Sequence, residues 1–221
     1  MATAIATGPF GIATGSYVVE RDDWPLSIHR ARTEGWRTIE LTAVLVARLE
    51  GLVALLAGEP GALNGFERVS VHAPVLFARE RSEVRTILAG LPFELILHPD
   101  VYGNEPWVEA LGSRAVFENM DVAKSYGREV AELDEVLDRF PEAGFCLDVA
   151  HVWTNDPTLQ LGHELLDAFG ARLRQLHVSG IEPDGTHRST TRADLELYEP
   201  LLTRCAHVPW LLEGELAEDA R

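Results

Sequence analysis

Eight short, mostly apolar runs alternate with segments of helical spacing along this 221-residue chain. The runs lie at residues 11–16, 38–41, 68–72, 93–98, 115–118, 145–148, 173–177 and 209–213, and the amphipathic segments at 24–34, 44–57, 79–89, 105–111, 122–139, 158–169 and 192–205. Strands that alternate with helices form parallel sheets with helical crossovers. Eight such units of roughly 30 residues close into a (β/α)8 barrel of the TIM type. We therefore expect one compact barrel domain over residues 1–221.

The eighth unit of this barrel lacks a full helix. Only eight residues follow Glu213, too few for a loop and a covering helix. The outer face of the last strand would then be exposed, and apolar patches of several hundred Å² are uncommon on monomers. We therefore expect a homo-oligomer, most simply a dimer. An open doubly wound sheet is the alternative fold, but Gly11 and Gly15 do not form its G-x-G-x-x-G phosphate loop.

Composition argues against several functional classes. The chain has ordinary globular proportions, with 46% hydrophobic and 24% charged residues. No apolar run approaches the ~20 residues of a membrane helix, and the N-terminus lacks the charged segment of a signal peptide, so we expect a cytoplasmic protein. The net charge of −16 argues against a nucleic-acid partner. Lys124 is the only lysine, which argues against Schiff-base chemistry.

Side chains that can bind a metal end six of the predicted strands. They are His72, His98, Glu118, Asp148, His177 and Glu213. The carboxyl ends of barrel strands meet at one mouth, where the active sites of this fold lie. Three carboxylates confined there repel one another unless a cation compensates them. Mixed Glu, Asp and His ligands suit zinc, manganese or iron better than calcium, so we expect a divalent-metal site. Glu40 ends the second predicted strand and is a candidate for facing the pocket, but a solvated strand end is the favoured position.

The same strand ends resemble those of the xylose-isomerase-like TIM-barrel superfamily. This group contains sugar isomerases and epimerases, and also the endonuclease IV type of apurinic-site DNA repair enzyme (AP endonuclease family 2). The resemblance rests on residues 71–74, 97–100, 117–121, 147–151, 176–179 and 212–213. Glu118-Asn119 and Asp148-x-x-His151 are its more specific motifs. The resemblance implies a divalent metal (Mn, Zn, Mg, Co or Fe) held by Glu118, Asp148, His177 and Glu213.

In the isomerase branch, the resemblance implies that the metal binds a carbonyl oxygen and a neighbouring hydroxyl of a small sugar-like substrate. This acidifies the C–H bond between them. Glu118 and Glu213 are then the catalytic residues that remove and return the proton. Arg188 is a candidate for pairing with a substrate anion, and Trp107 for a wall against a sugar face.

In the endonuclease branch, further metals are held by histidines of the third and fourth strands, here His72 and His98. Another metal uses the Asp-x-x-His histidine, here His151, together with an Asp-x-His pair. This chain has His187, but Gly185 stands where the aspartate belongs and Asp184 is one position away. The four histidines are therefore candidates for a second metal or for substrate binding. A metal-dependent phosphodiesterase is the alternative function, and a metal-binding barrel without catalysis is the third.

Overall fold

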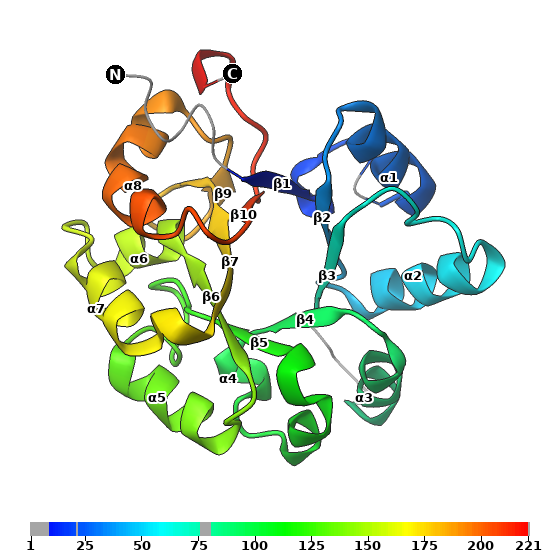
Figure 1. Cartoon of the computed structure of the whole chain (residues 1–221), viewed down its shortest axis with the longest axis horizontal. Helices are drawn as coiled ribbons and strands as arrows, with labels where there is room; N and C mark the ends of the chain where they lie inside the picture. Colours follow the sequence, from blue (N-terminus) through cyan, green and yellow to red (C-terminus); the bar gives the residue numbers. More distant parts are fainter. Residues whose placement is uncertain (1–8, 21, 76–80, 221) are drawn as a thin grey trace.

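A closed barrel of eight parallel strands forms the centre of the molecule, in the order β1-β10-β7-β6-β5-β4-β3-β2. The structure is a computed structural model that describes residues 9–20, 22–75 and 81–220. The barrel strands are β1 (Phe10–Ala13), β2 (Thr38–Thr42), β3 (Arg68–His72), β4 (Glu94–Leu97), β5 (Ala115–Glu118), β6 (Gly144–Asp148), β7 (Leu173–Val178) and β10 (Trp210–Leu212). Figure 1 shows these strands as a ring with the helices outside it. The predicted (β/α)8 barrel is confirmed.

Helices cover the outer face of the barrel. They are α1 (Trp24–Thr33), α2 (Val46–Gly58), α3 (Arg81–Gly90), α4 (Pro99–Tyr102), α5 (Val130–Arg139), α6 (Val149–Asn155), α7 (Gln160–Phe169) and α8 (Arg192–Arg204). Short 3-10 segments lie at Thr14–Ser16, Pro106–Arg114, Gly170–Arg172 and Glu218–Ala220, and β8 (Gly180–Ile181) pairs with β9 (His187–Arg188) in a small hairpin. Among the described residues, none of the helices combines the length and apolar content that crossing a bilayer requires.

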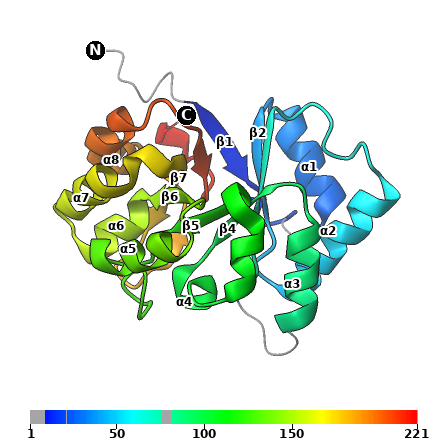
Figure 2. The same ribbon diagram turned by 60° about the horizontal axis from the view of Figure 1, so that its bottom comes forward.

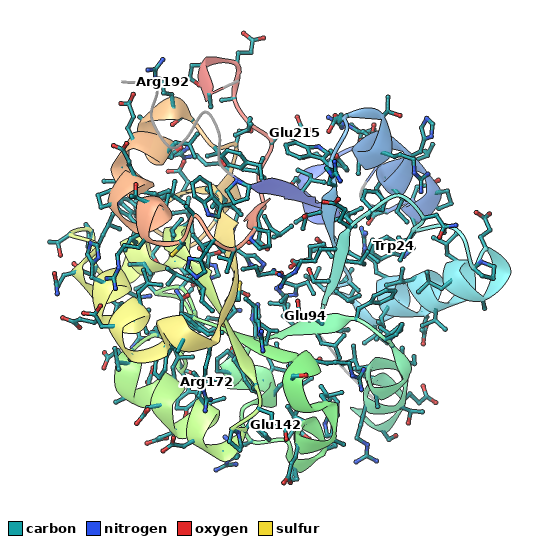
Figure 3. All side chains as sticks on the ribbon, in the orientation of Figure 1. Trp24, Glu94, Glu142, Arg172, Arg192 and Glu215 are labelled. Carbon is teal, nitrogen blue, oxygen red and sulfur yellow. The ribbon has the colours of Figure 1, made fainter. Side chains whose placement is uncertain are left out.

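Residues of the strands alternate between the outer and the inner face of the barrel. Outward residues such as Ile39, Leu41 and Phe117 are fully buried beneath the helices. Inward residues form a separate, smaller core inside the ring, in which Ile96 and Val116 contact Cys146. Side chains fill this interior in Figure 3. Because successive side chains point to opposite faces, the inward set continues to the carboxyl end of every strand and there reaches the mouth.

The helix predicted at residues 122–139 begins only at Val130. Residues 119–129 form a loop instead, because Asp121 Oδ1 accepts a hydrogen bond from the backbone of Ala123 at 2.7 Å and Gly127 adopts a φ of 89°. Side chains of Asn and Asp that bond to the nearby backbone compete with helix formation. The backbone N–H of Glu129 and the side chain of Glu132 then form a capping box that starts α5.

Two further segments differ from the expected pattern. The helix expected at 105–111 is a 3-10 segment that spans Pro106–Arg114 and is kinked at Gly112, which has a φ of 56°. Helix α6 follows β6 directly and was not expected, and it begins there because Asp148 Oδ1 accepts a hydrogen bond from the N–H of His151 at 2.7 Å. Residues 79 and 80 of another expected helix lie outside the described residues.

The missing eighth helix is confirmed for the described residues, because only a 3-10 turn at Glu218–Ala220 follows β10. The C-terminal segment takes the place between α8 and α1 in Figures 1 and 2. Glu215 Oε1 accepts a hydrogen bond from Arg30 Nη2 on α1 at 3.0 Å, and Figure 3 labels Glu215 on the side of this segment that faces α1. Thr190 and Leu216 form an isolated parallel bridge. The segment thus ties α1 to the chain that leads into α8.

The expected exposure of the last strand is wrong. Trp210 and Leu212, the outward residues of β10, are 0% and 1% exposed. The indole of Trp210 packs edge-to-face on Phe10 with 5.3 Å between ring centroids, and its Nε1 donates to the carbonyl of Cys205 at 3.0 Å. The expected dimer rested on this exposure, so it stays a prediction without that support.

We expect Trp210→Ala to destabilise the fold by about 3–5 kcal/mol, because it leaves a cavity where β10 closes the ring against β1. Urea unfolding followed by circular dichroism measures this change. Leu197→Ala is the control, since Leu197 on α8 is 41% exposed and should change stability little. An equal effect of the two substitutions would contradict the role given to Trp210.

Candidate metal centre

Six predicted site residues stand at or next to the carboxyl ends of six strands. They are His72 of β3, His98 after β4, Glu118 of β5, Asp148 of β6, His177 of β7 and Glu213 after β10. Glu213 is the most exposed of them, and its side chain is only 13% exposed. The strands therefore bring the predicted residues together at one buried mouth.

Four of these residues form a central group: Glu118, Asp148, His177 and Glu213 each offer one ligand atom, and the four atoms lie within 4.8 Å of one another. The imidazole Nδ1 of His177 lies 2.8 Å from Glu118 Oε1 and 3.3 Å from Glu213 Oε1. Asp148 Oδ2 is buried and, within the described part of the chain, has no hydrogen-bond partner. Buried carboxylate oxygens are rarely left unpaired, so this oxygen suits a metal ligand.

Two histidine groups flank the central group and share its carboxylates. In the first, the Nε2 atoms of His72 and His98 lie 3.3 Å apart and at 3.4 and 3.5 Å from Glu118 Oε2. In the second, the Nε2 atoms of His151 and His187 lie 3.1 Å apart, and His151 Nε2 lies 3.6 Å from Asp148 Oδ2. The mouth therefore offers three adjoining sets of ligands.

Backbone contacts select the nitrogen that two of the flanking histidines, His72 and His151, present to the mouth. The Nδ1 atom of His72 lies 3.0 Å from the carbonyl of Ala73, and that of His151 lies 2.8 Å from the carbonyl of Asn119. A carbonyl only accepts, so these Nδ1 atoms carry the proton and the Nε2 atoms present lone pairs. Lone pairs that face other acceptors at hydrogen-bond distance require a cation or a proton between them. The side chain of Asn119 also holds the backbone of Asp148 through two hydrogen bonds of 2.8 and 3.0 Å.

The pKa values of Glu118 and Glu213, two carboxylic acids of the mouth, shift in opposite directions. Burial opposes the ionisation of Glu118, but His177, His72 and His98 outweigh it and hold the pKa of Glu118 well below its ordinary value. Burial raises the pKa of Glu213, and the carboxylate of Glu118 adds to this while His177 opposes it. A divalent cation bound by the central group would offset both the repulsion between these carboxylates and the cost of burying their charges. The donor set and its unpaired oxygens therefore fit a divalent metal.

A cavity of about 550 Å³ opens above these groups. Its floor includes His72, His98, Glu118, His151, His187 and Glu213, and its rim includes Asp22, Arg48, Asp121 and Lys124. Small-molecule sites commonly have volumes of roughly 300–1,000 Å³. Sequence reasoning did not single out Arg48, because it does not end a strand, and it gave Asp121 no role of its own.

The favoured solvated position of Glu40 is wrong. Its side chain lies inside the barrel, where Glu40 is 0% exposed. Its Oε2 lies 3.0 Å from Nε2 of His177. Burial opposes its ionisation, yet the pKa of Glu40 is lowered because His177 and His72 attract the negative charge. The alternation in β2 could have revealed this position, since Ile39 and Leu41 on either side face the helices.

Arg188 and Trp107, the two residues expected to touch substrate, are not brought to the cavity. The guanidinium of Arg188 binds both carboxylate oxygens of Asp194 at 2.7 and 2.8 Å and lies 3.1 Å from Glu182. Trp107 packs edge-to-face on Tyr102 with 6.1 Å between ring centroids. Each therefore serves packing or ion pairing, and Arg188 fixes the hairpin strand that carries His187.

Asp184 does not replace the aspartate that is missing before His187. It lies in the turn between β8 and β9, where its Oδ1 accepts a hydrogen bond from the N–H of Thr186 at 3.0 Å. The ligand group of His187 in the described chain consists of Asp148, His151 and His187. The hairpin itself places His187 in the mouth, where its Nδ1 lies 3.0 Å from Ser179 Oγ.

Comparison with known proteins finds matches in fold only, because no family model and no curated protein sequence matches the chain. A D-tagatose 3-epimerase-like protein has a TM-score of 0.56 at 14% identity and covers 96% of this chain and 92% of its own. An L-ribulose 3-epimerase has a TM-score of 0.57 at 12% identity, with coverages of 95% and 82%. A xylose isomerase-like TIM barrel protein from Mycobacterium smegmatis, in complex with magnesium, has a TM-score of 0.53 at 11% identity, with coverages of 100% and 94%. The chain therefore has the fold of the xylose isomerase-like TIM barrel proteins.

We expect the purified protein to contain close to one tightly held divalent ion, and we expect chelation to lower its melting temperature. A ligand that binds only the folded state stabilises it by about 2.7 kcal/mol at a free concentration of 100 times its Kd. Elemental analysis counts the ion, and differential scanning calorimetry measures the shift with and without chelator. Asp148→Asn is the control, because it should bind the ion weakly and respond little to chelation. Metal-free protein that takes up neither manganese nor zinc would refute the site.

We expect the ion pair of Arg188 and Asp194 to make the free energy of unfolding depend on pH in the acid range. Burial opposes the ionisation of Asp194, but Arg188 and Thr191 outweigh it and lower the pKa of Asp194. The pair thus stabilises the fold above the ordinary aspartate pKa of about 3.9 and stops doing so as the pH falls through the lower, folded value. Asp194→Asn should cost about 1 kcal/mol at pH 7, because Arg188 is 37% exposed and screened by solvent.

Urea unfolding at several pH values measures this dependence, and the difference from the wild type should shrink as the pH is lowered from 5 towards 2. Glu196→Gln is the control, since Glu196 on the same helix is 58% exposed and paired with Arg192. A difference that persists unchanged at the acid end would show that the pair does not act through charge.

Proposed function

We propose that the protein is a divalent-metal-dependent isomerase or epimerase of a sugar or sugar-like polyol that contains a carbonyl group. The observation that best supports this is the central group of three carboxylates and one histidine, which lies at an open cavity of about 550 Å³, large enough for a monosaccharide. Glu118, Asp148, His177 and Glu213 would hold the ion. A bound ion polarises the carbonyl of the substrate and so acidifies the neighbouring C–H bond. The choice among Mn, Zn, Mg, Co and Fe stays open, although one structure of this fold contains magnesium.

Glu118 and Glu213 are the proposed proton carriers. Each directs one oxygen at His177, and their other oxygens diverge. Glu118 Oε2 faces the His72 side of the mouth, and Glu213 Oε2 lies 3.6 Å from Nδ1 of His187. Their strands, β5 and β10, are separated in the ring by β6 and β7. A substrate carbon between the two carboxylates can therefore lose its proton to one and regain it from the other.

Other cavity residues are proposed to bind the rest of the substrate. His151 and His187 are at the floor, within reach of hydroxyl groups beside the central group. Arg48 and Lys124 at the rim would bind polar or anionic substituents. Arg48 is held in place, since its guanidinium lies 4.4 Å from the ring centroid of Trp24 and 3.2 Å from Asp22.

A metal-dependent phosphodiesterase is the second candidate. The group of His72, His98 and Glu118 favours it, because this group adjoins the central group through Glu118. Carboxylates shared by two ligand sets are typical of two-metal sites, which stabilise both oxygens of a phosphoryl displacement. The net charge of −16 weighs against a nucleic-acid substrate.

We expect Glu213→Gln to lower isomerase activity by about 10²–10⁴-fold, because it keeps an oxygen ligand but removes the proton carrier. The assay is deuterium uptake from solvent into a panel of ketoses by the metal-loaded enzyme. His72→Ala should matter less, since proton transfer between Glu118 and Glu213 does not involve β3. Glu196→Gln is the matched control, because it makes the same chemical change at the surface of α8.

Cleavage of an oligonucleotide that contains an abasic site separates the two candidates. Exchange that depends on Glu213 but tolerates His72→Ala supports the isomerase. Strand cleavage that is lost in each of His72→Ala, His98→Ala and His187→Ala would overturn the isomerase in favour of the phosphodiesterase.

A further inference from the structure

Glu40 is a buried carboxylate that the proposed reaction does not use. It lies on β2 within the ring, below the mouth, and belongs to none of the three ligand groups found among the described residues. Burying a carboxylate is costly unless hydrogen bonds or opposite charges compensate it. Other inward positions, on β4 and β5, hold Ile96 and Val116, so the interior of this barrel accepts apolar side chains. The charge at Glu40 therefore calls for an explanation beyond packing.

One oxygen of Glu40 makes all of its contacts. Its Oε2 accepts from Gln175 Nε2 at 2.6 Å and from Ser70 Oγ at 3.2 Å, and lies 3.0 Å from Nε2 of His177. Its Oε1 is buried and has no hydrogen-bond partner in the described part of the chain. Two neighbours, Gln175 and Ser70, thus orient the carboxylate toward the ring of His177.

The ring of His177 faces two different environments. Its Nδ1 points to the central group, 2.8 Å from Glu118 Oε1 and 3.3 Å from Glu213 Oε1, whereas its Nε2 points away from the mouth to Glu40. A neutral imidazole has a proton on one nitrogen and a lone pair on the other. Only the form with the proton on Nε2 leaves Nδ1 free to bind a metal.

Two neighbours of Nε2 favour opposite forms of the ring. Gln175 Nε2, 2.9 Å away, is a donor and would favour a lone pair on Nε2, which places the proton on Nδ1. Glu40 Oε2 only accepts, so it favours the proton on Nε2. Glu40 also accepts a hydrogen bond from Gln175 Nε2 at 2.6 Å, so one of the two N–H groups of this amide is directed at the carboxylate and not at the ring.

We propose that Glu40 is a positioning residue for the metal centre: by accepting the Nε2–H of His177, it keeps Nδ1 free as a ligand and fixes the plane of the ring. This rests on the proposed metal site. Outer carboxylates that hold a ligating histidine in this way typically contribute 10–100-fold to metal affinity. A residue that served only the packing of the interior would leave the metal affinity unchanged.

Zinc titration of Glu40→Met tests the proposal, because methionine is close in size and has no strong acceptor. Occupancy is followed through the ring signals of His177 in long-range ¹H–¹⁵N spectra against a competing chelator, so that binding at the flanking histidine groups does not contribute. We expect Glu40→Met to bind zinc about 10–100-fold more weakly than wild type. Its remaining zinc-bound form should show an Nε2–H signal of His177 shifted upfield.

Ser70→Ala is the matched control, since it removes another hydrogen bond to the same oxygen of Glu40 and leaves the contact with His177. Its affinity for zinc should stay within about threefold of wild type. If Glu40→Met does not fold, Glu40→Gln is used, whose neutral and weaker acceptor should still shift the Nε2–H signal upfield. Wild-type affinity in Glu40→Met, or an unshifted signal in Glu40→Gln, would overturn the role of Glu40.

The same titration separates this proposal from the proposed function. Wild-type protein in which neither zinc nor manganese changes the signals of His177 overturns both. Wild-type protein that binds zinc but exchanges no deuterium into ketoses overturns the isomerase alone, and the role of Glu40 is still decided by the affinity of its variant.

Discussion

Closing parallel strands into a ring forces their inward side chains to share one axis, and this constraint determines both the interior and the mouth. Within the ring, Ile96, Val116 and Cys146 fill the space at one level. One step closer to the carboxyl ends, the same faces hold Glu118 and Asp148. No loop has to be ordered to bring these groups together, because the pairing of the strands fixes their spacing.

This convergence confines several carboxylates in a buried space, and the histidines balance their negative charge. The imidazole of His177 stands between Glu118 and Glu213 on one side and Glu40 on the other. Each flanking pair of histidines directs Nε2 atoms at a carboxylate of the central group. The mouth is thus built in layers, with a buried acceptor beneath, the central group above it, and polar side chains at the rim of the cavity. A site organised in this way is rigid where it binds a cation and more variable where it would meet a substrate.

Strand ends could be predicted from the sequence, whereas the loops between them could not. The alternation of apolar and polar residues identified Glu118 and Asp148 as inward residues, because a strand has only two faces. The surroundings of Trp107 and Arg188 could not be predicted, because they come from other segments: Trp107 contacts Tyr102, and Arg188 binds Asp194 of the next helix. Glu40 was misjudged for a different reason. A glutamate at a strand end is usually solvated, and only the burial of both its neighbours identifies it as an inward residue.

The central group draws on β5, β6, β7 and β10, which are consecutive in the ring, and Glu118 extends it to His72 and His98 of β3 and β4. Bound cations would therefore act as cross-links over most of the circumference. Strand β1 is outside this clamp, because its inward positions are Gly11 and Ala13. β2 offers no ligand to the three groups found among the described residues, and its side-chain link to them is Glu40. The barrel consequently has one arc that cations would cross-link and another that depends on hydrogen bonds alone, such as those from Ser16 Oγ to the carbonyl of Leu212 at 2.7 Å and from the N–H of Thr42 to Thr14 Oγ1 at 2.9 Å.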